Sequence, residues 1–177
     1  MVSPLWVFGY GSLLWDPGFV PAEVCAARLH GWHRSFSMRS IHYRGTVEVP
    51  GLVLALDERA GAACDGLAMR VENAQAEAVL AALRARELVS DAYLERRFLV
   101  ELIDGRGVDV LTYVIDPQGP QYCDLSLEDQ AQSIAKACGM RGPNCDYLNN
   151  THAHLLSLGV EDADLAWLVK RVREING

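Results

Sequence analysis

The sequence lacks the features that mark several common classes of protein. No apolar run approaches the roughly 20 residues that a membrane-spanning helix needs. The apolar stretch Leu5–Trp15 has no basic leader, so we expect neither a signal peptide nor a membrane span. The five cysteines contain no Cys-x-x-Cys pair. Free thiols in a reducing cytoplasm are therefore the expected state, and the cytoplasm is the expected location.

Positive charge and metal-ligand patterns are also scarce. The chain of 177 residues has 16 basic and 23 acidic residues and a formal net charge of −7. Nucleic acid and anionic membrane surfaces are therefore excluded as expected partners, and an anionic small molecule would need local hydrogen-bond donors. The five histidines are scattered, and His152 and His154 cannot share a helix face. The sequence predicts no metal site, and it does not indicate an oligomeric state.

The most informative stretch is the Gly-Tyr-Gly-Ser segment that begins at Gly9. It lies between two apolar arms, and the first arm, Leu5–Phe8, predicts a buried strand because it is short, aromatic and β-branched. Gly9 and Gly11 permit positive φ and close backbone approach. The N–H groups of Gly11, Ser12 and Leu13 can then point at one carboxylate or developing oxyanion.

Two better-known glycine motifs do not fit this segment. A dinucleotide-binding fingerprint and a nucleophile elbow would each need a glycine at the position of Leu14. The simplest alternative is a tight turn at the end of a core strand.

A carboxylate lies in line with the apolar face of a predicted helix. Asn73 can cap a helix that begins near Ala74. Its apolar positions recur at spacings of three and four: Ala76, Val79, Leu80 and Leu83. Glu87 lies four residues beyond Leu83, in the final turn of this helix. There the helix dipole and burial both raise the pKa of a carboxyl, toward the value that suits a general base. The alternative is a surface ion pair between Glu87 and Arg84.

The remaining pattern predicts an α+β fold, a small mixed bent sheet or barrel with flanking helices. We expect a single domain over residues 1–177, strand-rich in 1–120 and helical in 124–175. The expected strands are 27–38 (bent at Gly31), 52–56, 66–71, 93–102 and 108–115, with a turn at 57–63. The expected helices are 126–138, 144–158 and 161–173. A long loop at 39–51 carries Arg39 and Arg44, which either face an anionic substrate or are ordinary surface charges.

The segment Phe8–Trp15 resembles the signature of the ChaC family, the glutathione-specific γ-glutamylcyclotransferases. Further matches follow in family order over nearly the whole chain: His42–Gly45, Pro50-Gly51, Gly66–Val71, Arg86–Leu88, Tyr93-Leu94, Gly142–Asn144 and Tyr147-Leu148. The resemblance implies the γ-glutamylcyclotransferase-like fold, a small mixed barrel. One departure is the Leu-Val-Ser-Asp-Ala segment after Glu87, where family members carry glycines.

The resemblance also implies a reaction without cofactor or metal. The glutamyl α-amine of glutathione attacks its own γ-carbonyl, giving 5-oxoproline and Cys-Gly, and Glu87 acts first as base and then as acid. The loop residues Gly11, Ser12 and Leu13 would hold the glutamyl head. The other expected substrate-binding residues are Tyr10, Tyr93 and Tyr147, as pocket walls or donors, and Arg44, for the glycine carboxylate. The alternatives are a cyclotransferase for other γ-glutamyl amino acids or amines, and a non-catalytic binding module of the same fold.

Overall fold

The computed structural model describes residues 3–177 and contains a closed five-stranded barrel. The strand order is β1-β3-β2-β4-β5, and the mixed α+β architecture confirms the predicted fold class. The strands are β1 (Trp6–Gly9), β2 (Glu23–Ser40), β3 (Gly51–Arg70), β4 (Tyr93–Leu102) and β5 (Gly107–Ile115). Strand β1 is antiparallel to β3 and parallel to β5.

The chain divides into two compact units. The first comprises Met1–Arg34 and Leu56–Gly119, and the second comprises Ser35–Ala55 and Pro120–Gly177. Strands β2 and β3 therefore contribute residues to both units. The single domain expected from the sequence stays a prediction.

In the first unit, β1 is buried on both faces, which explains its uninterrupted apolar sequence. Trp6 and Phe8 belong to one cluster of buried side chains, whereas Val7 belongs to another. Strand β5 divides its side chains in the same way, with Val110 in the first cluster and Leu111 in the second. Successive side chains of a strand point to opposite faces, so a strand buried on both faces carries apolar residues in succession, as at Trp6–Phe8 and Val110-Leu111.

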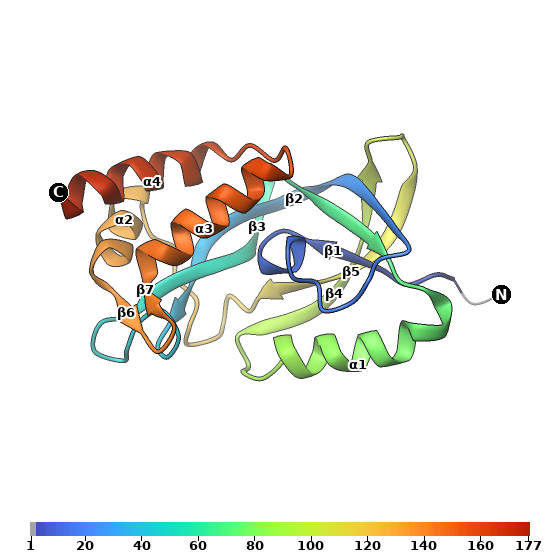
Figure 1. Ribbon diagram of the computed structural model, residues 1–177, viewed down its shortest axis with the longest axis horizontal. Helices are drawn as coiled ribbons and strands as arrows, with labels where there is room; N and C mark the ends of the chain where they lie inside the picture. Colours follow the sequence, from blue (N-terminus) through green and yellow to red (C-terminus); the bar gives the residue numbers. More distant parts are fainter. Residues whose placement is uncertain (1–2) are drawn as a thin grey trace. The chain divides into compact units, whose positions relative to one another are not determined.

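Helix α1 (Ala76–Glu87) is the α-helix of the first unit, seen in green in Figure 1. Its buried residues are Val79 and Leu83, as the spacing predicts. The helix begins later than expected, because Asn73 lies in a short 3₁₀ helix, η2 (Asn73–Gln75). No side-chain capping bond is present at the start of α1, so the predicted Asn73 cap is wrong.

The predicted turn at 57–63 is also wrong, because β3 is one continuous strand of 20 residues. Its polar middle, which resembles a turn in sequence, is an exposed part of a long strand rather than a chain reversal. Gly61 has φ of 80° inside this strand, a conformation that glycine adopts without steric cost. In β2, Gly31 has φ of 83°, at the position of the predicted bend.

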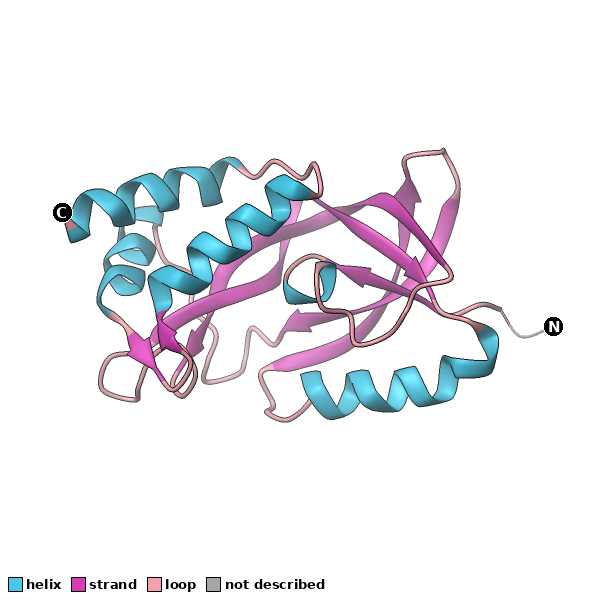
Figure 2. Ribbon diagram, in the orientation of Figure 1, coloured by secondary structure: helices cyan, strands magenta, loops and turns pink. Residues whose placement is uncertain are grey.

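The second unit carries the helices α2 (Leu127–Lys136), α3 (Asn144–Ser157) and α4 (Ala163–Asn176), which pack against one another (Figure 2). Helix α2 ends earlier than predicted, since Cys138–Gly139 (β6) pairs with Gly142–Pro143 (β7) in a small hairpin. The hairpin packs on the preceding loop: Met140 N–H donates to the His42 carbonyl at 2.8 Å. A Cβ at Gly139 would lie 2.5 Å from the backbone of Tyr43, so only glycine fits there.

Asn144, the first residue of α3, fastens this helix to β3. Its side chain is fully buried, and its amide nitrogen donates to the Leu52 carbonyl at 2.8 Å. In return, the Leu52 N–H donates to Asn144 Oδ1 at 2.7 Å. One side-chain amide thus satisfies both polar groups of a buried strand residue, as a neighbouring strand would.

We expect Asn144→Ala to destabilise the protein by about 2–4 kcal/mol, because it leaves two buried backbone groups of Leu52 without partners. Urea unfolding at constant pH measures this change. Asn149→Ala, on the exposed side of the same helix, is the matched control and should change stability by less than about 0.5 kcal/mol. Equal effects of the two substitutions would contradict the anchoring role of Asn144.

Candidate active site

Helix α1 holds Glu87 at the end of its apolar face. The Glu87 side chain is 16% exposed. Burial raises the pKa of its carboxyl, and the neighbouring Arg86 opposes this only in part, so the predicted direction of the shift is confirmed. The alternative pairing with Arg84 is wrong, since Arg84 forms a bidentate pair with Glu95 of β4 at 2.8 and 2.7 Å.

The Glu87 carboxylate forms few ion pairs or hydrogen bonds with the protein, although its side chain is largely buried. Within residues 3–177, its one ion pair or hydrogen bond joins its Oε1 to Arg86 Nε at 3.3 Å. A buried carboxylate in a folded protein normally accepts several hydrogen bonds. The carboxylate of Glu87 therefore has acceptor capacity left for a ligand.

The Gly-Tyr-Gly-Ser segment forms a tight loop after β1. Leu14 N–H donates to the Gly11 carbonyl at 2.9 Å, and Asp16 N–H donates to the Ser12 carbonyl at 2.9 Å, around a 3₁₀ turn, η1 (Ser12–Leu14). The N–H groups of Gly11, Ser12 and Leu13 have no acceptor among residues 3–177. They therefore have donor capacity left over, and their predicted role in binding an anionic group stays a prediction.

Of the two reasons expected for the glycines in this loop, positive φ is wrong and close backbone approach is confirmed at Gly9. Gly11 has φ of −136°, and Gly9 is not among the described glycines with positive φ. Gly9 is required by space instead: a Cβ there would lie 3.0 Å from Met69 Cε and 3.2 Å from the Leu14 nitrogen. The absence of a side chain lets the loop fold back on the strand.

Arg86 joins this loop to the carboxylate, a contact that the sequence analysis missed. Its Nη2 donates to Ser12 Oγ at 3.1 Å, and its Nη1 donates to the Asp16 carbonyl at 2.6 Å. The Asp16 carboxylate lies 3.7 Å from the same Nη1. One guanidinium therefore contacts both the loop and Glu87.

Apolar packing brings the same parts together. Leu13 of the loop shares a buried cluster with Val79 and Leu83 of α1 and with Tyr113 of β5. Tyr93 is partly buried against this cluster. The structure thus gathers Gly11, Ser12, Leu13, Tyr93 and Glu87 in the first unit.

Two tyrosines lie deeper in this unit. Tyr10 is 7% exposed, and its hydroxyl donates to the Tyr113 carbonyl at 2.8 Å. The Tyr113 hydroxyl donates to Glu95 at 3.2 Å. Burial and the nearby charges of Glu95 and Glu87 raise the pKa of Tyr113. Tyr113 was not predicted as a site residue, because it sits in an apolar strand with no signal to separate it from core residues.

The remaining predicted residues, Arg44 and Tyr147, belong to the second unit. The Arg44 guanidinium lies over the Tyr147 ring, 5.7 Å from its centroid. Its Nη1 donates to the carbonyls of Arg141 and Pro143 at 2.9 and 3.2 Å. The Tyr147 hydroxyl accepts from the Leu54 N–H at 3.3 Å.

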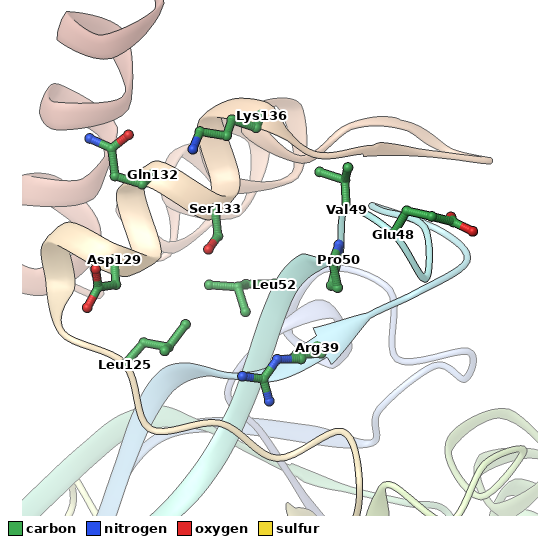
Figure 3. Close-up of a pocket in the computed structure, with 10 residues that line it drawn as sticks. All are labelled: Arg39, Glu48, Val49, Pro50, Leu52, Leu125, Asp129, Gln132, Ser133 and Lys136. Atoms are coloured by element: carbon green, nitrogen blue, oxygen red, sulfur yellow. The ribbon is translucent and has the colours of Figure 1, made fainter.

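The second unit also has a pocket of about 420 Å³ (Figure 3). Helix α2 provides one wall, with Lys136 and Asp129 among its side chains, and Arg39 and Leu52 belong to the opposite wall. Arg39 Nη1 donates to the Tyr122 carbonyl at 2.9 Å. None of the site residues expected from the resemblance is among those that line this pocket.

The described residues contain neither a cluster that could hold a metal ion nor a helix that could cross a membrane. No group of three or more His, Cys, Asp and Glu side chains within residues 3–177 is placed to hold a metal ion. Within the same range, every helix is too short or too polar to cross a membrane.

Comparison with solved structures defines the class of the fold. A crystal structure of a γ-glutamyl cyclotransferase specific to glutathione from yeast superposes with a TM-score of 0.84 and 21% identity, over 99% of this chain and all of that one. The fold is therefore that of γ-glutamyl cyclotransferases, as predicted.

Sequence comparison defines the family. The model of the ChaC-like protein family matches residues 5–175, so this chain belongs to that family. A glutathione-specific γ-glutamylcyclotransferase of Escherichia coli K12 is 38% identical over 98% of this chain and 74% of its own length. A glutathione-specific γ-glutamylcyclotransferase 1 of Danio rerio is 36% identical over 82% of this chain and 76% of its own length.

Burial of Glu87 predicts a pH-dependent cost in stability. Its folded pKa lies above the unfolded value of about 4.3, so the folded state binds the proton more tightly. The stability of the parent should therefore fall as pH rises from about 4 through the folded pKa, whereas Glu87→Gln has no such ionisation. We expect this variant to melt above the parent at pH 8, with a smaller difference at pH 4, when both are followed by calorimetry.

The matched control is Glu58→Gln, which removes an exposed carboxylate of β3. It should shift the melting temperature of the protein by similar small amounts at the two pH values. A difference between Glu87→Gln and the parent that is largest at pH 4 would contradict the raised pKa.

Proposed function

We propose that this protein is a γ-glutamylcyclotransferase that cleaves glutathione into 5-oxoproline and Cys-Gly. The observation that carries the proposal is the Glu87 carboxylate, which is largely buried and has a raised pKa. Among residues 3–177, its one ion pair or hydrogen bond is with Arg86. The carboxylate is linked through Arg86 to a loop in which the N–H groups of Gly11, Ser12 and Leu13 have no acceptor among residues 3–177. Membership of the ChaC-like family supports this reading, as do relatives named for the same activity.

The proposed reaction closes a ring within the substrate. The α-nitrogen of the glutamyl group forms a bond to the γ-carbonyl carbon, and the bond from that carbon to the cysteinyl nitrogen breaks. All atoms of glutathione are retained in the two products, so no water or second substrate enters. The nucleophile is tethered to its target, and the enzyme has to supply conformation and proton transfer.

Glu87 is suited to the proton transfer. An ammonium cannot attack, so the α-amine must first lose a proton, and the departing cysteinyl nitrogen must gain one. A single carboxylate between the two nitrogens can serve as base and then as acid. A raised pKa makes the ionised carboxylate a stronger proton acceptor, and a pKa closer to neutrality suits a group that must both take up and release a proton.

The loop is suited to hold the negative charges of the substrate and transition state. Backbone N–H groups of Gly11, Ser12 and Leu13 can donate to the glutamyl carboxylate or to the tetrahedral oxyanion. In our proposal Tyr10 and Tyr93 form part of the pocket wall. The proposed mechanism uses neither a metal ion nor an organic cofactor.

The main alternative from another class is a binding module without turnover. Incubating the purified protein with glutathione and following 5-oxoproline release separates the two. Release at a rate proportional to protein concentration supports the enzyme, and binding of glutathione without release supports the module.

Cellular location follows from the same proposal. Glutathione is a cytoplasmic thiol, and no cysteine of the described residues forms a disulfide. We therefore propose that the protein works in the cytoplasm.

Replacing Glu87 should abolish turnover while leaving substrate binding. Glu87→Gln keeps the size of the side chain but cannot accept the proton, so kcat should fall at least about 100-fold. Calorimetric titration should still detect glutathione. The control is Glu58→Gln, with parental kcat expected. A Glu87→Gln variant with near-parental turnover would show that another group is the base.

Substrate preference is the finer part of the proposal. We expect kcat/KM to be higher for glutathione than for γ-Glu-Ala or γ-Glu-ε-Lys. Arg44 is proposed to meet the glycine carboxylate, and a charge-assisted contact of about 1.5–3 kcal/mol corresponds to about one to two decades in kcat/KM. Arg44→Ala should reduce the preference by that amount.

The two parts of this prediction can fail separately. Equal kcat/KM for the three substrates in the parent would remove the glutathione assignment and leave the cyclotransferase assignment. A preference that is unchanged in Arg44→Ala would remove the role of Arg44, whose guanidinium would then serve the carbonyls of Arg141 and Pro143 only.

A further inference from the structure

We propose that Arg86 is a positioning residue, which fixes Ser12 as a hydrogen-bond donor to the substrate and holds the Glu87 carboxylate beside it. This inference rests on the proposed function, in which Glu87 is the base and the loop binds the glutamyl head. Its evidence is independent: the contacts of one guanidinium with both elements.

The contact with Ser12 sets the direction of its hydroxyl. A guanidinium has five N–H donors and no acceptor, so Ser12 Oγ must accept from Arg86. This is the one side-chain hydrogen bond of Ser12 within residues 3–177. The single O–H of Ser12 is therefore left to donate, and a carboxylate or oxyanion of the substrate is the kind of group that it can meet.

The contacts with the backbone fix the loop itself. The donation from Arg86 to the Asp16 carbonyl at 2.6 Å ties down the residue that follows η1, and the Asp16 carboxylate lies 3.7 Å from the same nitrogen. The guanidinium is planar and its donors diverge in fixed directions, so it can hold Ser12, Asp16 and Glu87 in one arrangement. Movement of the loop relative to the base would break at least one of these contacts.

The contact with Glu87 also has an electrostatic consequence. Burial raises the pKa of the Glu87 carboxyl, and the positive charge of Arg86 lowers it. The other charged and titratable groups near this pair lie on a turn and on two strands. The Asp16 carboxylate after η1 lies 3.7 Å from Arg86. Tyr113 of β5 feels the charges of both Glu87 and Glu95 of β4, and Glu95 is paired with Arg84.

Arg84 cannot replace Arg86 in this role. Arg84 is two positions away on the helix, so its side chain points elsewhere, and it is held by both carboxylate oxygens of Glu95. Arg86 is therefore the one cation with an ion pair to Glu87 among the residues that the structure describes.

The test compares Arg86→Gln, Arg86→Lys, Ser12→Ala and the double variant Arg86→Gln/Ser12→Ala with the parent. The measurements are kcat and KM for glutathione between pH 5.5 and 9, with thermal melting as a check of folding. Arg97→Gln is the matched control, because Arg97 is an exposed arginine of β4 whose ion pair with Asp109 lies outside the machinery. It should keep parental kinetics.

We expect Arg86→Gln to reduce kcat/KM at pH 7 by about 10- to 100-fold, as misplacement of reacting groups commonly does. The acid limb of its kcat/KM profile should move to higher pH, because the charge that lowers the pKa of Glu87 is lost. Arg86→Lys keeps this charge, so its acid limb should stay near the parental position. Its kcat/KM should remain reduced, since one ammonium cannot bridge three partners.

The double variant tests whether Arg86 acts through Ser12. If it does, the loss in Arg86→Gln/Ser12→Ala is smaller than the product of the two single losses. Multiplicative losses, or parental kcat/KM with an unmoved acid limb in Arg86→Gln, would overturn the proposal.

A second readout separates this proposal from the proposed function. The pKa of Glu87 can be followed by NMR of ¹³C-labelled carboxyl groups in the parent and in Arg86→Lys and Arg86→Gln, whether or not glutathione is cleaved. A higher pKa in Arg86→Gln than in Arg86→Lys supports the pairing even if the parent releases no 5-oxoproline. Equal values overturn it even if the parent is active.

Discussion

The burial of one carboxylate at the end of an apolar helix face is the constraint on which the site depends. Val79 and Leu83 pack α1 into a cluster that also contains Leu13 of the loop. A spacing of four extends the same face to Glu87, so the packing that places the helix also removes this carboxylate from water. Because burial and the helix C-terminus both disfavour the charged form, the arrangement costs stability. It persists because the apolar face is favourable enough to offset that cost.

Two arginines of α1 form ion pairs with different carboxylates nearby. Arg84 takes Glu95 of β4 in a bidentate pair, and Tyr113 also donates to that carboxylate. Glu95 is therefore fully engaged by the structure, and its pKa lies below the usual range. Arg86 makes one ion-pair contact with Glu87 and uses its other donors on the loop. Two carboxylates in one unit thus differ in availability, and the difference follows from how many donors each receives.

The sequence predicts the parts of this site that depend on local periodicity. The spacing in α1 identifies Glu87 and the direction of its pKa shift, and the apolar runs around the glycine segment identify β1 and its loop. The predicted turn within β3 fails because a polar run can be an exposed strand. The predicted positive φ in the loop also fails, whereas the close approach at Gly9 is confirmed and involves a distant neighbour, Met69. The Arg86 contact joins residues 74 positions apart and has no periodic signal. The roles of all the expected site residues stay predictions: Glu87 as the base, and Tyr10, Gly11, Ser12, Leu13, Arg44, Tyr93 and Tyr147 in substrate binding.

Burial and the charge of Arg86 shift the pKa of Glu87 in opposite directions, and this balance suits the chemistry proposed for Glu87. Burial alone disfavours the ionised carboxylate, which is the form that must accept the ammonium proton. With full exposure it would be ionised but too weak a base to assist the attack. Arg86 lowers the pKa that burial raises, and it does so from a position where its other donors hold the loop. The ring closure needs a group that transfers protons and a set of donors for the oxyanion. A single guanidinium that contacts both Glu87 and the loop can hold these two parts of the site in a fixed arrangement.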